Sequence, residues 1–217
     1  MNQKNTIPKR LEKAFDLLYL ILVPLLGLAL ILTAHSAPRA LWGVMAFVLV
    51  GGDAFHLAPR LLAAGSEDPR RYQKALGTGK QITSITMTVF YLLLWHIGLM
   101  LFQRSLPAYT ALLYILLMIR AALCLLPQNA WTSETPSLRW GIIRNIPFAI
   151  QGLMVALLFG AYGTGQPGLG DLWLAIALSF GFYLPVVLFS RTNPKIGMLM
   201  LPKTCVYVWI ICMGFSI

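Results

Sequence analysis

Residues 41–62 read LWGVMAFVLVGGDAFHLAPRLL, and this segment decides the fold class of the chain. It is close to the ~20 apolar residues that an α-helix needs to cross the hydrocarbon core of a bilayer. Asp53, His56 and Arg60 are its titratable exceptions. A carboxylate inside a bilayer costs several kcal/mol unless it is paired, so such a residue commonly marks a functional site. Asp53 is the only acidic residue that we expect to be buried in a long apolar segment.

The same kind of apolar segment recurs along the rest of the chain. The further segments cover about 15–33, 81–103, 108–127, 142–162, 171–190 and 196–216. Helix breakers such as Pro38, Pro69 and Pro107 lie between them. We therefore predict an all-α fold, a polytopic bundle of seven transmembrane helices that forms a single integral membrane domain over residues 1–217. The third and fourth segments are separated only by a tight turn and are expected to form a hairpin.

The composition agrees with a membrane protein and excludes other classes. Hydrophobic residues make up 58% of the 217 residues, charged residues only 11%, and the mean hydropathy is +0.74. Soluble globular domains carry about 25% charged residues, so this chain cannot cover a water-exposed surface with charge. The net charge of +10 does not indicate nucleic-acid binding, because the basic residues lie mostly between the apolar segments and no matching motif is present.

The cysteines and histidines point to neither a metal site nor a cofactor. Cys124, Cys205 and Cys212 lie in or beside apolar segments, at spacings that fit neither a zinc site nor a disulfide framework. We expect them to act as small packing residues. Three scattered histidines and one buried carboxylate make no metal-ligand pattern, so no metal and no cofactor are expected.

The basic residues predict the orientation in the membrane. The first segment is longer than the apolar core of a signal peptide, about 7–15 residues, so we expect it to remain as the first helix. With the N-terminus in the cytoplasm, only Arg39 and Arg104 fall outside. The residues then assigned to the cytoplasmic side are Lys4, Lys9, Arg10, Lys13, Arg60, Arg70, Arg71, Lys74, Lys80, Arg139, Arg144, Arg191 and Lys195. This asymmetry predicts a multi-pass protein of the bacterial inner membrane with its C-terminus outside.

Polar residues inside the apolar segments gather in one half of the predicted bundle. At about 1.5 Å per residue, the membrane-embedded charges all fall in the cytoplasmic half. Asp53, His56 and Arg60 are spaced i, i+3 and i+7 and share a helix face, and such stripes normally face the bundle interior. The residues expected to line one cavity open to the cytoplasm are Asp53 and His56 as candidate catalytic groups, and Arg60, Lys80, Ser84, Tyr91, Arg120, Arg144, Gln151, Lys203 and Tyr207 as candidate ligand contacts.

The charges of this set do not balance. The carboxylate of Asp53 faces five cations, and we expect at least one of them within salt-bridge reach because isolated buried charges are costly. The remaining positive charge calls for an anion, such as the phosphate or carboxylate of a ligand. Structural explanations stand beside this interpretation. Long cations near helix ends can snorkel to the interface, and Asp53 or His56 can serve to join helices.

Three functions are consistent with the pattern. The first is the binding or transport of an anionic amphiphile or small anion in a cation-rich intramembrane cavity. The second is a membrane-embedded lipid hydrolase or transferase, with Asp53 or His56 as the acid–base group and the cations holding the anionic part of the substrate. The third is an accessory subunit whose charges contact a membrane protein partner. The sequence does not decide whether the chain is an enzyme.

Three stretches resemble motifs of an uncharacterised bacterial family of polytopic membrane proteins: GDAFHL at 52–57, SITMTVFY at 84–91 and LPKT at 201–204. The resemblance covers most of the chain and implies no activity. The Gly52-Asp53 pair also resembles the lysoplasmalogenase family of small multi-spanning membrane enzymes. The second acidic motif of that family has no counterpart, since Asp171 lies at the outer edge of the sixth segment. Lys203 resembles the lysine of retinal proteins, but Leu199 stands where a counterion one turn earlier would be.

The orientation can be tested with reporter fusions. We expect a fusion within 65–80 to report the cytoplasm and a fusion after Ile217 to report the outside, because basic residues concentrate on the side that holds 65–80. One reporter that is active only inside and one that is active only outside measure both positions. If 65–80 proved to be outside, the predicted orientation would be wrong, and so would the prediction that the embedded charges share the cytoplasmic half.

Overall fold

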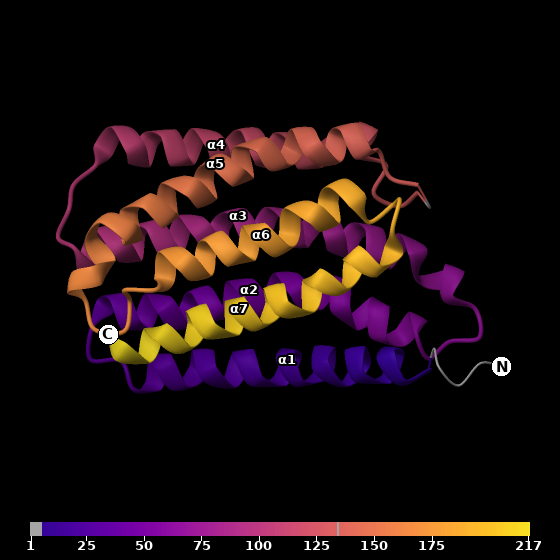
Figure 1. Ribbon diagram of the computed structural model, residues 1–217, viewed down its shortest axis with the longest axis horizontal. Helices are drawn as coiled ribbons and strands as arrows, with labels where there is room; N and C mark the ends of the chain where they lie inside the picture. The colour runs from indigo at the N-terminus through magenta and orange to yellow at the C-terminus, as the bar shows by residue number, and fades with distance from the viewer. Residues whose placement is uncertain (1–5, 134) are drawn as a thin grey trace.

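Long helices account for nearly all of the computed structural model, which describes residues 6–133 and 135–217. Within these residues the chain is helical, without strands, and seven α-helices run antiparallel along the bundle (Figure 1). Their bounds are α1 Thr6–Leu32, α2 Ala37–Ala63, α3 Gln73–Leu101, α4 Pro107–Leu125, α5 Leu138–Tyr162, α6 Leu172–Phe189 and α7 Met200–Met213. The predicted all-α architecture is confirmed, as are seven helices long and apolar enough to cross a membrane.

Three helices begin at residues that hydropathy did not indicate. α1 starts at Thr6, well before the predicted 15, and α3 starts at Gln73 although 73–80 is polar. Gly77 and Gly79 are buried in that first part of α3. Packing, and not hydropathy, therefore explains why the helix begins before its apolar segment. α7 starts late, at Met200, because the chain first forms the 3₁₀ helix Pro194–Leu199.

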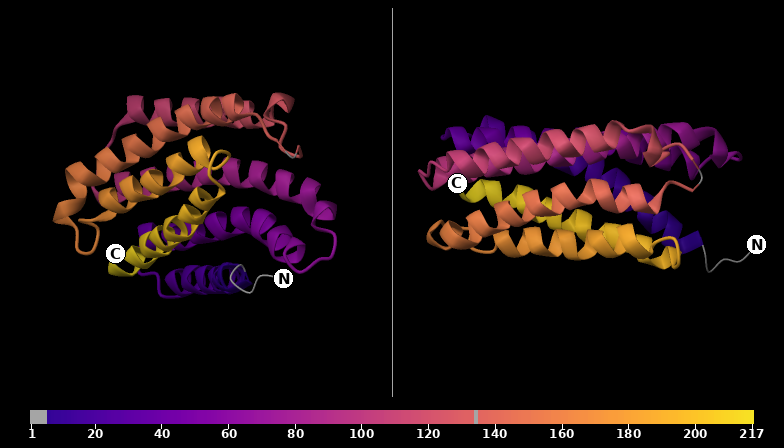
Figure 2. Two further views of the ribbon diagram at one scale, coloured as in Figure 1. Left: turned by 45° about the vertical axis from the view of Figure 1, so that its right-hand side comes forward. Right: turned by 90° about the horizontal axis from the view of Figure 1, so that it is seen from above.

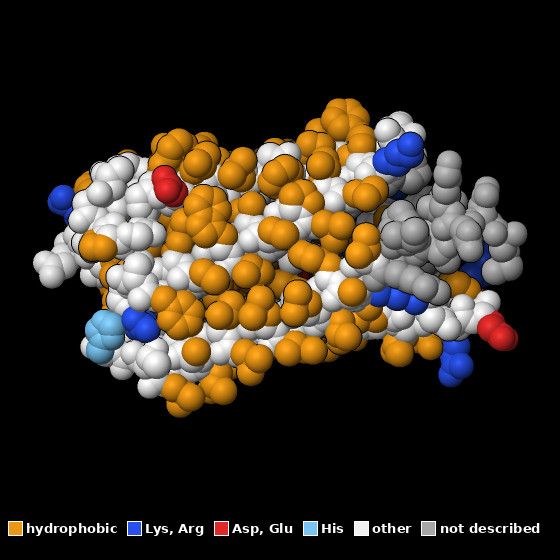
Figure 3. Space-filling view, turned by 60° about the horizontal axis from the view of Figure 1, so that its bottom comes forward, with side chains coloured by type: hydrophobic (Ala, Val, Ile, Leu, Met, Phe, Trp, Pro, Cys, Tyr) orange, Lys and Arg blue, Asp and Glu red, His pale blue; other side chains and the backbone are white. Residues whose placement is uncertain are grey.

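The outer surface of the bundle is apolar. Figure 3 shows hydrophobic side chains over the middle of one face and charged side chains toward its two ends. Along α1, Leu17, Leu18, Ile21, Leu25 and Leu28 are each about half exposed. Soluble monomers rarely expose apolar patches of more than a few hundred Å². An apolar band with charged margins is the surface expected of a multi-pass membrane protein.

Helices that are consecutive in sequence pack against one another in space, and α7 returns to contact α1 and α2 (Figure 2). The chain reverses at both ends of the bundle. The loops at 64–72, 126–137 and 190–199 lie at the end that holds the start of α1, which we call the N-terminal end (Figure 1). The C-terminus and the loops at 33–36, 102–106 and 163–171 lie at the opposite end. The predicted hairpin of α3 and α4 is present, and Lys4 lies outside the described residues.

Two glycines bring α2 and α3 close together. Gly52 of α2 lies against Thr86, and the hydroxyl of Thr83 donates a hydrogen bond to the Gly52 carbonyl at 2.9 Å. Gly79 of α3 lies against the Phe55 carbonyl. Pro59 has no N–H to bond that carbonyl within α2, so the carbonyl is open to the approach of α3. A side chain at either glycine would meet backbone or Thr86, so the two helices depend on glycine here.

Replacing these glycines should reveal the contact. We expect Gly79→Ala to lower the free energy of unfolding by about 1–3 kcal/mol, because the added Cβ would overlap the backbone of Phe55 and His56. Gly51→Ala is the matched control, since nothing lies within 4 Å of a Cβ at that position, and it should be neutral or slightly stabilising. Thermal unfolding in detergent compares the two. Equal melting temperatures would contradict the proposed close contact.

Candidate functional site

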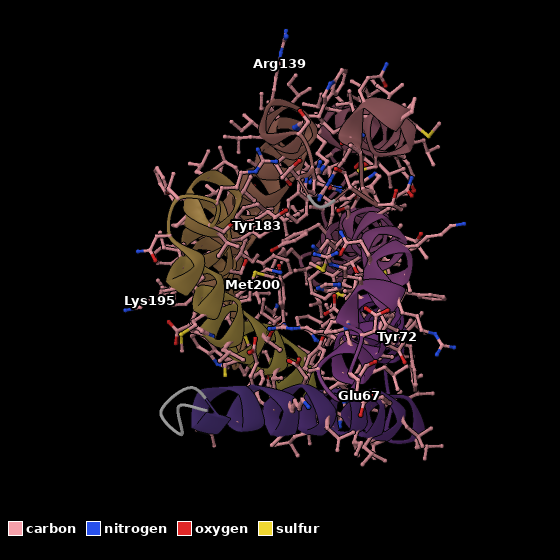
Figure 4. All side chains as sticks on the ribbon, turned by 90° about the vertical axis from the view of Figure 1, so that its right-hand side faces the viewer. Glu67, Tyr72, Arg139, Tyr183, Lys195 and Met200 are labelled. Atoms are coloured by element: carbon pink, nitrogen blue, oxygen red, sulfur yellow. The ribbon has the colours of Figure 1, made fainter. Side chains whose placement is uncertain are left out.

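Polar side chains from several helices meet inside the bundle toward its N-terminal end. Figure 4 looks along the bundle from that end. Tyr183 of α6 and Met200 of α7 lie on the inward side of their helices, whereas Arg139 and Lys195 point outward. Two cations of this end, Arg139 and Lys195, thus face away from the bundle interior.

Asp53 is held by a tyrosine. The hydroxyl of Tyr19, a buried residue of α1, donates a hydrogen bond of 2.7 Å to Oδ2 of Asp53. The expected salt bridge is absent: no cation of the described part of the chain lies in ion-pair contact with Asp53. Lys203 is near enough to act on Asp53 electrostatically. No sequence pattern indicated Tyr19, because a tyrosine in an apolar segment resembles an ordinary packing residue.

Arg60 has acidic partners that the sequence interpretation missed. It forms an ion pair with Glu12, and its Nη1 lies 3.6 Å from Oδ2 of Asp16. Asp16 is 5% exposed and buried, whereas Asp53 is only half-buried, so the expectation that Asp53 is the only buried acidic residue was wrong. The predicted start of the first helix at residue 15 left Glu12 outside the helix, so the pairing of Glu12 with Asp16 on one face was missed. With α1 beginning at Thr6, Glu12 and Asp16 are one turn apart on the same face.

His56 lies one turn after Asp53 on α2. Its Nδ1 is buried and makes no hydrogen bond within the described residues. The close approach of Gly79 to the backbone of His56 leaves α3 directly beside this position. A buried ring nitrogen without a partner is available to a ligand or to a water molecule.

Arg120 is the most completely buried cation among the candidate residues. Its side chain is 1% exposed, and Nε and Nη1 make no hydrogen bond within the described residues. The guanidinium carbon lies 3.5 Å from the centre of the Phe148 ring. No carboxylate of the described residues forms an ion pair with it. A cation–π contact is worth about 2 kcal/mol when desolvated, which is less than the cost of an uncompensated buried charge.

Lys203 is surrounded by aromatic rings. Its Nζ lies 4.7 Å from the ring centre of Tyr207 and 5.1 Å from that of Tyr183. The Tyr183 hydroxyl donates to Oδ1 of Asn145 at 2.9 Å. Within the described residues, Lys203 forms no ion pair. Like Arg120, it is a positive charge in the interior that rings, and not carboxylates, contact.

Arg144 stabilises the end of α4. Its Nη1 donates to Oδ1 of Asn129 at 2.8 Å, and its guanidinium lies 4.0 Å from the centre of the Trp131 ring. Asn129 in turn donates to the carbonyls of Leu123 and Leu126. Leu123 lies in the last turn of α4 and Leu126 is its C-cap, so the Asn129 side chain adds hydrogen bonds at the end of this helix. Arg144 thus has a structural task, and the polar groups around it already have partners.

The remaining candidate residues mostly join helices. Gln151 donates to the Thr88 carbonyl at 3.0 Å, and Tyr91 shares a hydrogen bond of 3.0 Å with Ser179. The Ser84 hydroxyl bonds the Lys80 carbonyl within α3, while the Lys80 side chain is exposed. Tyr207 is buried, and its ring packs edge-on against that of Phe90. Lys203, one turn before Tyr207 on α7, is the residue of the two that can bind an anion.

Metal ligands do not gather in this region. In the described part of the chain, no group of three or more His, Cys, Asp or Glu side chains is placed to hold a metal ion. Cys124, Cys205 and Cys212 are all free thiols.

The cations of this region therefore differ in their partners. Arg60, about a third exposed, is neutralised by carboxylates of α1, whereas the buried Arg120 and the half-buried Lys203 have no carboxylate in contact among the described residues. Uncompensated cations in a buried site can bind an anion, and Asp53 with His56 adds titratable groups beside them. The arrangement is that of a multi-pass, all-helical membrane protein with a positively charged interior site. Comparison with known proteins finds no matching family model, no matching curated protein and no matching solved structure.

Substitutions at Asp53 distinguish its structural contribution, the hydrogen bond from Tyr19, from a role in the site. We expect Asp53→Asn to keep the stability within about 1 kcal/mol, because the amide oxygen can still accept from Tyr19 and no salt bridge is broken. Asp53→Leu should cost about 1–3 kcal/mol, since the Tyr19 hydroxyl loses its acceptor, and adding Tyr19→Phe should recover much of the loss. Thermal unfolding in detergent gives all three values.

A different result would identify Asp53 as a counterion. If Asp53→Asn were strongly destabilising and Lys203→Met restored the stability, the carboxylate would be serving to neutralise Lys203.

Proposed function

We propose that this protein binds or transports an anionic amphiphile or a small anion at an interior site that contains Arg120 and Lys203. Asp53 and His56 lie beside this site in the proposal and orient the ligand or exchange protons with it. The N-terminus is cytoplasmic, the C-terminus is outside, and the membrane is the bacterial inner membrane. The asymmetric distribution of basic residues supports this orientation.

The observation that carries the proposal is the state of Arg120. It is 1% exposed, lies over Phe148, and has two guanidinium nitrogens without hydrogen-bond partners among the described residues. A phosphate or carboxylate near 4 Å would contribute about 4 kcal/mol at an effective dielectric constant of 20. An anion would also accept the unpartnered N–H groups, and guanidinium groups suit such bidentate contacts.

A groove at the side of the bundle favours an amphiphile over a small inorganic ion. It has a volume of about 610 Å³. Its lining combines residues of α1 with Met198 of the 3₁₀ helix before α7 and Leu201 of α7; the α1 residues are Leu11, Glu12, Ala14, Phe15 and Leu18. Glu12 is also the partner of Arg60, so the groove adjoins the charged interior. An apolar tail could occupy this groove while the charged group reaches the interior cations.

A lipid hydrolase or transferase is the second candidate, and one observation favours it. Nδ1 of His56 is buried without a partner, one turn from a carboxylate that is hydrogen-bonded to Tyr19. A neutral imidazole with a free ring nitrogen can act as a general base. In this version of the proposal the interior cations hold the phosphate of the lipid. A covalent product formed from lipid by the wild type, and lost in His56→Gln, would select it.

Replacing Arg120 tests the proposal. We expect purified Arg120→Met to retain at least about tenfold less anionic ligand than the wild type, because an unpartnered buried cation is removed. Its thermal stability without ligand should not fall, because replacing an uncompensated buried charge by an apolar group is often neutral or stabilising. Mass spectrometry of the retained molecules and thermal unfolding measure the two effects. Arg139→Met, which removes an outward-pointing cation at the same end, is the control.

Two outcomes would contradict the interior anion site. One is equal ligand retention by Arg120→Met and Arg139→Met. The other is a strong loss of stability in Arg120→Met that Arg120→Lys does not repair, which would identify the side chain as a packing element over Phe148. A partner protein that copurifies with the wild type, with no retained anion in either variant, would select an accessory subunit.

A further inference from the structure

A groove on the outer surface between α2 and α3 is separate from the interior site. It has a volume of about 660 Å³, and its floor is apolar. On α2, its lining includes Phe55, Ala58 and Pro59, which occupy the helix face opposite Asp53 and His56. None of the interior candidates Asp53, His56, Arg120 and Lys203 lines it.

Two exposed cations stand at one end of the groove. Arg71 belongs to the short 3₁₀ helix Pro69–Tyr72, and Lys74 lies in the first turn of α3. Neither side chain forms an ion pair within the described residues. The acidic residues of the same loop, Glu67 and Asp68, do not line the groove, and the Asp68 carboxylate accepts from the backbone N–H of Arg70.

The lining residues of α3 form one continuous stripe. Lys74, Ala75, Thr78, Gly79 and Ile82 recur at helical spacing, so the groove runs along the helix axis from its charged end. From Lys74 to Ile82 it extends about 12 Å, at about 1.5 Å per residue. One leaflet contributes about 15 Å of hydrocarbon, half of the total thickness of about 30 Å. The groove is therefore shorter than one leaflet. Its α2 wall belongs to the apolar segment 41–62, whereas its α3 wall is mostly the polar start of that helix, which places Arg71 and Lys74 on the headgroup side.

We infer that this groove binds an anionic phospholipid of the surrounding leaflet, with an acyl chain along α2 and α3 and the phosphate at Arg71 and Lys74. The occupant follows from the combination of charge and depth. An apolar floor, with its α2 wall in an apolar segment, favours an acyl chain over a water-soluble anion, and two cations at the rim favour a negative headgroup over a zwitterionic one. The close contact of Gly79 with the Phe55 backbone holds the two walls together, so the groove is formed before the lipid enters.

The thermodynamic test compares an anionic and a zwitterionic lipid. The purified full chain is titrated with phosphatidylglycerol and with phosphatidylcholine of the same acyl chains, and native mass spectrometry counts the bound lipids. We expect Arg71→Gln combined with Lys74→Gln to weaken phosphatidylglycerol binding by about 30-fold, or about 2 kcal/mol at 1.4 kcal/mol per tenfold. Phosphatidylcholine binding should change little, because it lacks net charge.

Matched variants separate a groove from general surface charge. Arg70→Gln combined with Arg191→Gln removes the same charge from exposed positions at the same end that do not line the groove. This control should keep most of the phosphatidylglycerol affinity. Ala58→Phe, which fills the groove, should weaken binding of the lipid, whereas Ala122→Phe on the exposed face of α4 should not.

Several results would overturn the inference. Equal losses in the two double variants would show only diffuse attraction of a basic surface for anionic lipid. Unchanged binding in Ala58→Phe would exclude the groove, and a protein that copurifies and is released by this variant would identify a protein partner there instead. Arg120→Met serves to separate the two sites: in this background Arg71→Gln combined with Lys74→Gln should cause the same loss of phosphatidylglycerol binding as in the wild type, whether or not the proposed interior site exists.

Discussion

Removing a charged side chain from water costs several kcal/mol, and a transmembrane helix has no solvent inside the bilayer to which it can return the charge. The polar interior of this bundle is arranged under that constraint. Glu12 and Asp16 of α1 neutralise Arg60 of α2, and this contact joins the first two helices near the N-terminal end. Arg144 donates a hydrogen bond to Asn129 and lies over a tryptophan ring, and these contacts stabilise the end of α4.

Arg120 and Lys203 meet the same constraint differently. Aromatic rings cover both, and neither has a carboxylate in contact among the described residues. Rings compensate only part of the lost hydration. Arg60 is neutralised by Glu12 and Asp16, and Arg144 is held by Asn129, so Arg120 and Lys203 are the cations of this region that only rings are seen to contact. Positive charge at two particular residues is more specific than a general excess of basic residues. It favours one defined anion site over a non-specific attraction of anions to the whole bundle.

The close contact of α2 and α3 relates the interior to the outer surface. Gly52, Gly79 and the carbonyl released by Pro59 let the backbones approach. One face of α2 then presents Asp53 and His56 inward, and the opposite face forms a wall of the outer groove. A change in the spacing of these helices would therefore alter both regions. This is the physical link through which a lipid in the groove would affect the interior site.

The sequence alone determined the all-helical architecture and the seven helices long and apolar enough to cross a membrane, because apolar length carries a strong energetic signal in a bilayer. It did not determine the pairing. Asp16 and Tyr19 were not identified as partners, since the true start of α1 depends on packing and a buried tyrosine resembles an ordinary core residue. The sequence placed Arg120 deeper than Arg144 but made both candidate ligand contacts. Only the tertiary structure identified their partners, because a partner is set by which side chains meet across helices, and no local pattern contains that information.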